Sequence, residues 1–199
     1  AIYSRSNNTY TKLTNPATLP NGNASDCCWS MDGNYLAFTH LYSPYFTVYS
    51  RSGNTFTKLA NPATPVMKAG NGCAFSPDGQ YLAVTLATAP YIAIYSFVGG
   101  VLTKLADPTT LPAGTAYKCS FSPDGNYLAI AHNYAPRLTI YSHSGDTFTK
   151  ISNPDSLPTD TGFDCEFSQD GTRFIVVHNA TPYMTVYSYD AGTFTKLDN

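Results

Sequence analysis

Three histidines stand at one position of a repeated pattern and could together bind a metal or carry protons. They follow an aromatic residue by eleven positions and are His40, His132 and His178, whereas the remaining copy has Leu86. Imidazole is a common metal ligand, and its pKa near neutrality suits proton transfer. In the alternative role, each histidine ends a strand and holds the following loop by a hydrogen bond. The leucine copy favours this structural role, so we predict no metal site, no cofactor and no catalytic residue.

Aromatic residues gather directly after these histidine positions. Tyr45, Tyr91 and Tyr183 each follow a proline, with Arg137 in the third copy, and Tyr42 and Tyr134 precede a proline by two residues. A tyrosine on an exposed loop beside asparagine and histidine suits a sugar, whose apolar face stacks on the ring while its hydroxyls bond at the rim. We therefore take these six side chains and the three histidines as candidate binding residues. In the alternative, the residue after each proline opens a strand and packs between neighbouring units.

Four of the five cysteines also recur at one position, namely Cys27, Cys73, Cys119 and Cys165. Cysteines one repeat apart are expected to exceed the Cα separation of about 7 Å that a disulfide allows. Cys27 and Cys28 are adjacent, so they point to opposite faces of their strand. No Cys-x-x-Cys pair occurs, and the spacing of Cys119 and His132 is not one that zinc sites use. Small buried apolar side chains are the expected role.

All these positions belong to one period of 46 residues. The segment FSPDGQYLAV at Phe75 returns as FSPDGNYLAI at Phe121, and more loosely at Trp29 and Phe167. A second segment, VYSRSGNTFTKL in one copy, is present five times in all, and NPATLP at Asn15 is one of four related copies. A constant spacing along the whole chain indicates a repeat architecture.

Each period contains four short β-prone runs separated by turn residues. In the second copy these are GCAFS, YLAVTL, PYIAIYS and a counterpart of FTKL, which we name strands a to d. Asp-Gly pairs between strands a and b suit tight hairpin turns. Four strands in 40–50 residues form the blade of a β-propeller. We predict an all-β propeller of about four and a half blades, with a two-stranded hairpin over 1–13 and blades over 24–59, 70–105, 116–151 and 162–197.

The S-P-D-G-x-Y-L turn resembles that of WD40-like and seven-bladed lactonase-like β-propellers, along the whole chain. The tandem FTKL, NPATLP and FSPDG segments are also similar to those of phage and bacterial multi-repeat surface proteins. The resemblance implies a binding or scaffold module, and the lactonase-like branch implies a hydrolase. A β-sandwich is the alternative fold, although it has no use for a strict 46-residue period.

The strand count is uneven, with four copies of strands a and b but five of c and d. Three explanations are open: a piece of a longer chain, a subunit that completes a ring with another copy, or a ring with an irregular half blade. Exposed strand edges favour pairing with another segment. We therefore expect self-association or a longer chain to complete the ring.

The composition excludes several function classes. Charged residues make up only 12% of the 199 residues, the net charge is −2, and lysine and arginine form no cluster, so a nucleic-acid partner is not expected. No apolar run approaches the 18 residues of a membrane helix, so we expect no membrane insertion. A chain poor in charge and rich in tyrosine, threonine and asparagine favours an extracellular or virion protein, without fixing the compartment.

The loops point to one face for binding. Strands of a blade alternate in direction, so the a–b and c–d turns share one face and the longer b–c and d–a loops share the other, where function is expected. Charges beside the repeated cysteines, such as Asp26, Lys118 and Glu166, would line the central channel. The leading hypothesis is a non-enzymatic binding or structural module, a part of a virion or surface appendage that binds a glycan or a protein receptor. An intracellular protein-interaction scaffold and a lactonase-like hydrolase are the alternatives.

Overall fold

The computed structural model describes residues 1–198, and this part of the chain contains eighteen strands and no helix. An N-terminal hairpin comprises β1 (Tyr3–Ser6) and β2 (Thr9–Lys12). No helix that could span a membrane occurs among the described residues. The all-β class predicted from the sequence is confirmed.

Four antiparallel sheets of four strands follow the hairpin. Blade 1 contains β3 (Ala24–Trp29), β4 (Tyr35–His40), β5 (Phe46–Ser52) and β6 (Thr55–Lys58). Blade 2 contains β7 (Gly70–Phe75), β8 (Tyr81–Leu86), β9 (Ile92–Val98) and β10 (Val101–Lys104). Blade 3 contains β11 (Ala116–Phe121), β12 (Tyr127–His132), β13 (Leu138–Ser144) and β14 (Thr147–Lys150). Blade 4 contains β15 (Gly162–Phe167), β16 (Arg173–His178), β17 (Met184–Asp190) and β18 (Thr193–Lys196).

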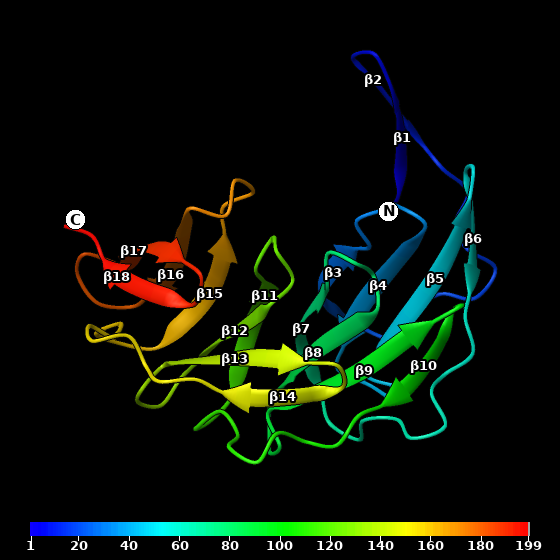
Figure 1. Ribbon diagram of the computed structural model, residues 1–199. Coiled ribbons are helices and arrows are strands. Elements are labelled where there is room, and N and C mark those ends of the chain that lie inside the picture. Colours follow the sequence, from blue (N-terminus) through cyan, green and yellow to red (C-terminus); the bar gives the residue numbers. More distant parts are fainter. Residues whose placement is uncertain (199) are drawn as a thin grey trace.

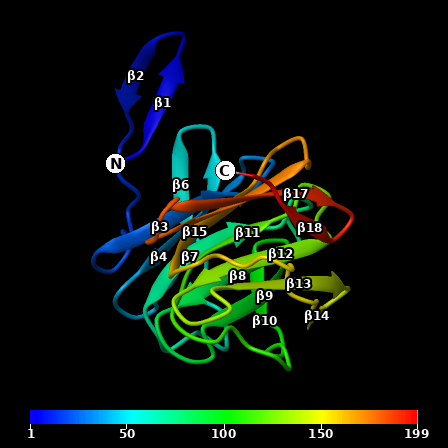
Figure 2. The same cartoon turned by 90° about the vertical axis from the view of Figure 1, so that its left-hand side faces the viewer.

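The blades stand side by side around an open arc (Figure 1). Within each blade the strands pair in chain order, and the first strands β3, β7, β11 and β15 contact one another at the inner side. The β1–β2 hairpin projects away from the blades, as Figure 2 also shows. The four-strand sheets and their 46-residue period are the predicted propeller blades.

The repeated Ser-Pro-Asp-Gly segment forms the turn between the first two strands of a blade. In blade 3 the carboxylate of Asp124 accepts hydrogen bonds from the Ser122 hydroxyl at 2.5 Å and from the Asn126 amide nitrogen at 3.1 Å. Gly125 adopts a φ of +75°, which glycine reaches without steric cost. The turn therefore needs this sequence for its own local hydrogen bonds.

In the interior blades, alternate side chains along a strand face the two neighbouring blades. In blade 2, Leu82 and Val84 pack toward blade 1, whereas Ala83, Ile92 and Ile94 pack toward blade 3. This period of two follows from the pleat of a strand and leaves the interior blades covered on both flat sides. The core is thus a series of layers between blades.

The two ends of the arc are only partly covered. In blade 4, Val177 is 42% exposed, whereas Ala131 at the same position of blade 3 is fully buried against blade 4. At the other end, Ile2 and Leu13 of the hairpin pack on the apolar side of blade 1, yet Trp29 stays 45% exposed. Both outer flat faces therefore retain apolar surface that the interior blades bury.

Candidate functional site

The b–c loop of each blade is a tight turn built around a cis proline. In blade 1 the amide of Tyr45 donates to the carbonyl of Tyr42 at 2.7 Å, and the His40 amide donates to the carbonyl of Tyr45 at 2.9 Å. The Ser43–Pro44 bond is cis, and Tyr45 has a φ of +69°. The same geometry recurs in the other three blades, so the loops present equivalent positions in the same way.

The three repeated histidines lie beneath these turns and inside the blades. Their Nε2 atoms lie 2.9–3.0 Å from a threonine hydroxyl on the neighbouring strand, in the pairs His40–Thr47, His132–Thr139 and His178–Thr185. All three are buried, and burial lowers the pKa of His132 to about 4. This burial removes the three histidines from the candidate binding residues, because a ligand on the loop face cannot reach them.

Blade 2 shows why the histidine can be lost. Leu86 replaces the histidine there, and Ala93 replaces the threonine that would pair with it. Removing both partners of a buried hydrogen bond leaves no polar group unsatisfied. The pair is therefore structural.

The residues after the prolines belong to the seams between blades. Tyr45 and Tyr91 are half-buried and pack against the apolar clusters that join their blade to the next. Arg137 is also half-buried, and its carbonyl oxygen would lie 2.8 Å from a Cβ built on Gly162 of blade 4. Tyr183 is 61% exposed, because no further blade follows it among the described residues.

Tyr42 and Tyr134 lie differently, as exposed rings supported from below. They are 60% and 64% exposed. A Cβ built on Gly22 would lie 2.3 Å from Cδ2 of Tyr42, and one built on Gly114 would lie 2.3 Å from Cδ2 of Tyr134. Each ring therefore rests on a glycine of the preceding d–a loop and is largely open to solvent. We call these two Tyr–Gly pairs the tyrosine platforms.

The other two blades lack both members of the pair. Blade 2 has Thr88 and Lys68 at these positions, and blade 4 has Ala180 and Asp160. Glycine therefore occurs only in the two blades that carry the tyrosine. A side chain at the glycine position would collide with the tyrosine ring. This matched change within one chain is a feature that the sequence pattern contained but that we did not use.

Polar groups surround the platforms. The side-chain amide of Asn21 donates to the carbonyl of Ser43 at 2.8 Å and so joins the d–a loop to the b–c loop of blade 1. At the blade 3 platform, Oδ1 of Asn133 lies close to Gly114 and is a buried oxygen without a hydrogen-bond partner in the described part of the chain. This oxygen has almost no solvent-accessible surface, so it belongs to the support beneath the Tyr134 ring rather than to the open surface.

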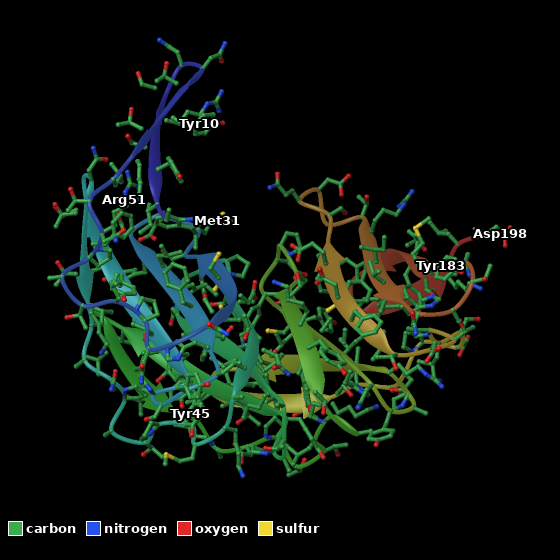
Figure 3. The ribbon with its side chains drawn as sticks, turned by 180° about the vertical axis from the view of Figure 1, so that it is seen from behind. Tyr10, Met31, Tyr45, Arg51, Tyr183 and Asp198 are labelled. Atoms are coloured by element: carbon green, nitrogen blue, oxygen red, sulfur yellow. The ribbon has the colours of Figure 1, made fainter. Side chains whose placement is uncertain are left out.

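A groove of about 820 Å³ lies at the other end of the blades, between the inner strands and the a–b turns. Figure 3 shows the separation, with Met31 of an a–b turn and Tyr45 of a b–c loop at opposite ends of blade 1. On the inner strands, Lys118 Nζ lies 2.5 Å from Asp26 Oδ1, and the Cys73 amide donates to Asp26 Oδ2 at 3.0 Å. Burial lowers the pKa of Lys118, but the bond and charge of Asp26 outweigh it and leave that pKa raised. This charge pair links the inner strands of blades 1 and 3, which are not neighbours in the arc.

Metal-ligating side chains do not converge in either region. Within residues 1–198, no group of three or more histidine, cysteine, aspartate or glutamate residues is placed to hold a metal ion.

Comparison with known proteins identifies the architecture. No protein-family model and no curated protein matches the sequence. The chain superimposes on a putative 6-phosphogluconolactonase from Bacteroides fragilis with a TM-score of 0.70, at 17% identity, over 88% of this chain and 53% of that one. The chain has the fold of the lactonase-like β-propellers.

Two further propellers extend the comparison. A functionally unknown protein from Desulfotomaculum acetoxidans matches with a TM-score of 0.73 at 18% identity, over 91% of this chain and 57% of that one. The periplasmic gluconolactonase PpgL of Pseudomonas aeruginosa matches with a TM-score of 0.66 at 17% identity, over 88% and 56%. The chain thus spans a little over half the length of these propellers, and identities this low establish the fold alone.

Proposed function

We propose that this propeller segment is a non-enzymatic binding module that holds a glycan on its b–c and d–a loops. The observation that carries the proposal is the pair of tyrosine platforms, Tyr42 on Gly22 and Tyr134 on Gly114. An aromatic ring that is supported on one side and open on the other offers an apolar plane for a pyranose. The neighbouring side-chain amides, such as that of the exposed Asn21, offer bonds to hydroxyls at its rim.

The spacing of the platforms favours a ligand with repeated units. They stand on blades 1 and 3 and share one face, with a blade between them that lacks the pair. A stacked pair of aromatic rings contributes about 0.5–1.5 kcal/mol, and with a similar gain from a sugar one platform alone binds weakly. Two sites engaged by one polymeric or clustered glycan gain affinity through effective concentration.

Additional blades would complete the ring, supplied by a second copy or by a longer chain. Support comes from the apolar outer faces at Val177 and Trp29 and from the half-length coverage of the matched propellers. In either case the binding face would extend beyond the two platforms. Native mass spectrometry of the recombinant chain tests whether a second copy completes the ring. A defined dimer or larger ring would support a second copy, whereas a monomer at micromolar concentration would favour a longer chain.

The experiment for glycan binding uses a glycan array and then titration calorimetry with the best ligand. Tyr42→Ala and Tyr134→Ala should each weaken binding, and the double variant should abolish it. Tyr10→Ala is the matched control, because Tyr10 is also an exposed tyrosine but lies on the N-terminal hairpin, away from the loop face. Equal losses in the control, or no sugar bound by the wild type, would refute the proposal.

Two other functions give different results in parallel assays. A protein-interaction scaffold would recover a peptide or protein partner and bind no sugar. A hydrolase would turn over a sugar lactone such as gluconolactone, the class of substrate in the names of two matched structures. If the Tyr42→Ala/Tyr134→Ala variant still turned over the lactone, the central groove would be the functional site instead of the loop face.

A further inference from the structure

Two cysteine thiols from neighbouring blades meet at the inner side of the arc. Sγ of Cys28 on β3 lies 3.2 Å from Sγ of Cys73 on β7. The sequence pattern predicts that cysteines at the repeated position, one blade apart, lie too far from each other to bridge. That expectation concerned the repeated position, whereas Cys28 stands one residue beyond it and reaches toward the next blade.

The cysteine at position 28 occurs in one copy only. The same position holds Ala74, Ser120 and Glu166 in the other blades. Cys73, in contrast, occupies the repeated cysteine position and is buried. The first two blades thus differ from the rest in having a second thiol placed against the repeated one.

We propose that Cys28 and Cys73 form a disulfide that joins the inner strands of blades 1 and 2. A disulfide has an S–S distance of about 2.05 Å, so the two sulfur atoms need to approach by only about 1 Å. Cys28 is half-buried on the wall of the central groove, which gives a small oxidant access to its sulfur. The bond would close a loop of more than forty residues across a blade interface that otherwise has only noncovalent contacts.

The oxidant is a low-molecular-weight disulfide such as oxidised glutathione. The Cys28 thiolate attacks one glutathione sulfur, which forms a mixed disulfide and releases one glutathione thiolate. The Cys73 thiolate then attacks Cys28 Sγ and releases the second glutathione. The two cysteines lose two protons and two electrons, and one glutathione disulfide is reduced to two thiols.

The local electrostatics make the reaction slow at neutral pH. The hydrogen bond to Cys73 raises the pKa of Cys28, and burial and the nearby Cys73, Cys119 and Asp26 raise it further. Lys118 also faces this cluster and pairs with Asp26. Because only the thiolate attacks, the exchange is best carried out at mildly alkaline pH.

The test uses the whole chain under native conditions. The protein is incubated at pH 8.5 with reduced and oxidised glutathione, remaining thiols are alkylated, and the digest is mapped by mass spectrometry. The expected product is a peptide pair linked through Cys28 and Cys73. The melting temperature of the oxidised protein should rise by roughly 5–15 °C and return on reduction.

Matched variants separate this bond from other thiol chemistry. Cys28→Ala introduces the residue that blade 2 has at the equivalent position, Ala74. This variant should lose both the linked peptides and the rise in melting temperature. Cys27→Ser changes the adjacent exposed thiol and should retain both. The proposal fails if the linked pair contains Cys27, if it forms only after unfolding, or if glutathione stays on Cys28 without release.

Discussion

The ring of Tyr134 lies directly over Gly114, so close that a Cβ on the glycine would fall 2.3 Å from the ring carbon Cδ2. The contact joins the b–c loop of blade 3 to the d–a loop that enters it. The glycine holds the ring in place and leaves its outer surface uncovered. Tyr134 as a whole is 64% exposed. A preorganised aromatic surface loses little entropy when a ligand stacks on it.

Gly114→Ala should therefore weaken glycan binding about threefold to tenfold, because the added methyl group displaces the Tyr134 ring. Asp160→Ala is the matched control at the same position of blade 4, where no tyrosine stands, and should leave the affinity unchanged. Calorimetric titration of both variants checks this. Unchanged affinity in Gly114→Ala would show that the supported ring is not the binding surface.

Tyr141→Phe should destabilise the protein by about 1 kcal/mol. The Tyr141 hydroxyl donates to the carbonyl of Thr110 at 2.7 Å and ties the d–a loop to strand β13, a bond repeated in all four blades. Tyr3→Phe is the control, because Tyr3 holds the same repeat position on the exposed hairpin. Urea unfolding of the two variants gives the difference; equal midpoints would mean that the loop bond adds no stability.

Acid should destabilise the protein through His132, whose burial lowers its pKa from 6.5 to about 4. The unfolded chain takes up a proton near pH 6.5 and the folded chain near pH 4. The stabilisation is therefore complete above pH 6.5 and lost as the pH falls toward 4, by about 3 kcal/mol in total. The double variant His132→Leu/Thr139→Ala, which copies Leu86 and Ala93 of blade 2, should unfold with a weaker dependence on pH between 4 and 7. A dependence as steep as that of the wild type would assign the acid sensitivity to other groups.

Asp124→Ala should destabilise the fold by about 1–2 kcal/mol and leave glycan affinity per folded molecule unchanged. Its carboxylate accepts hydrogen bonds from Ser122, Asn126 and the hydroxyl of Tyr189 on blade 4, so both a turn and a blade contact are lost. Asp155→Ala removes an exposed carboxylate in a d–a loop and serves as the control. Thermal unfolding and titration are measured on the same samples. A loss of affinity at an unchanged melting temperature would contradict a purely structural role for the turn.

Much of the fold could be predicted because each blade is specified locally. The alternation of apolar residues in YLAVTL, the Asp-Gly turns and the fixed period act within one blade, where neighbours in sequence are neighbours in space. The structural role of the histidines was also partly visible in the sequence, since Leu86 replaces one of them. Their removal from the candidate binding residues, however, required the burial that packing between strands creates.

The sequence by itself determined the four-stranded unit, its repetition and the loops that share a face, because turns and strand periodicity are short-range properties. Only the tertiary structure decided which aromatic rings are supported and open, since Gly22 and Gly114 lie twenty residues from the tyrosines that they support. It also decided that Cys28 meets Cys73, because that distance depends on how two blades pack. Contacts between units are set by the curvature of the whole array, which no single repeat encodes.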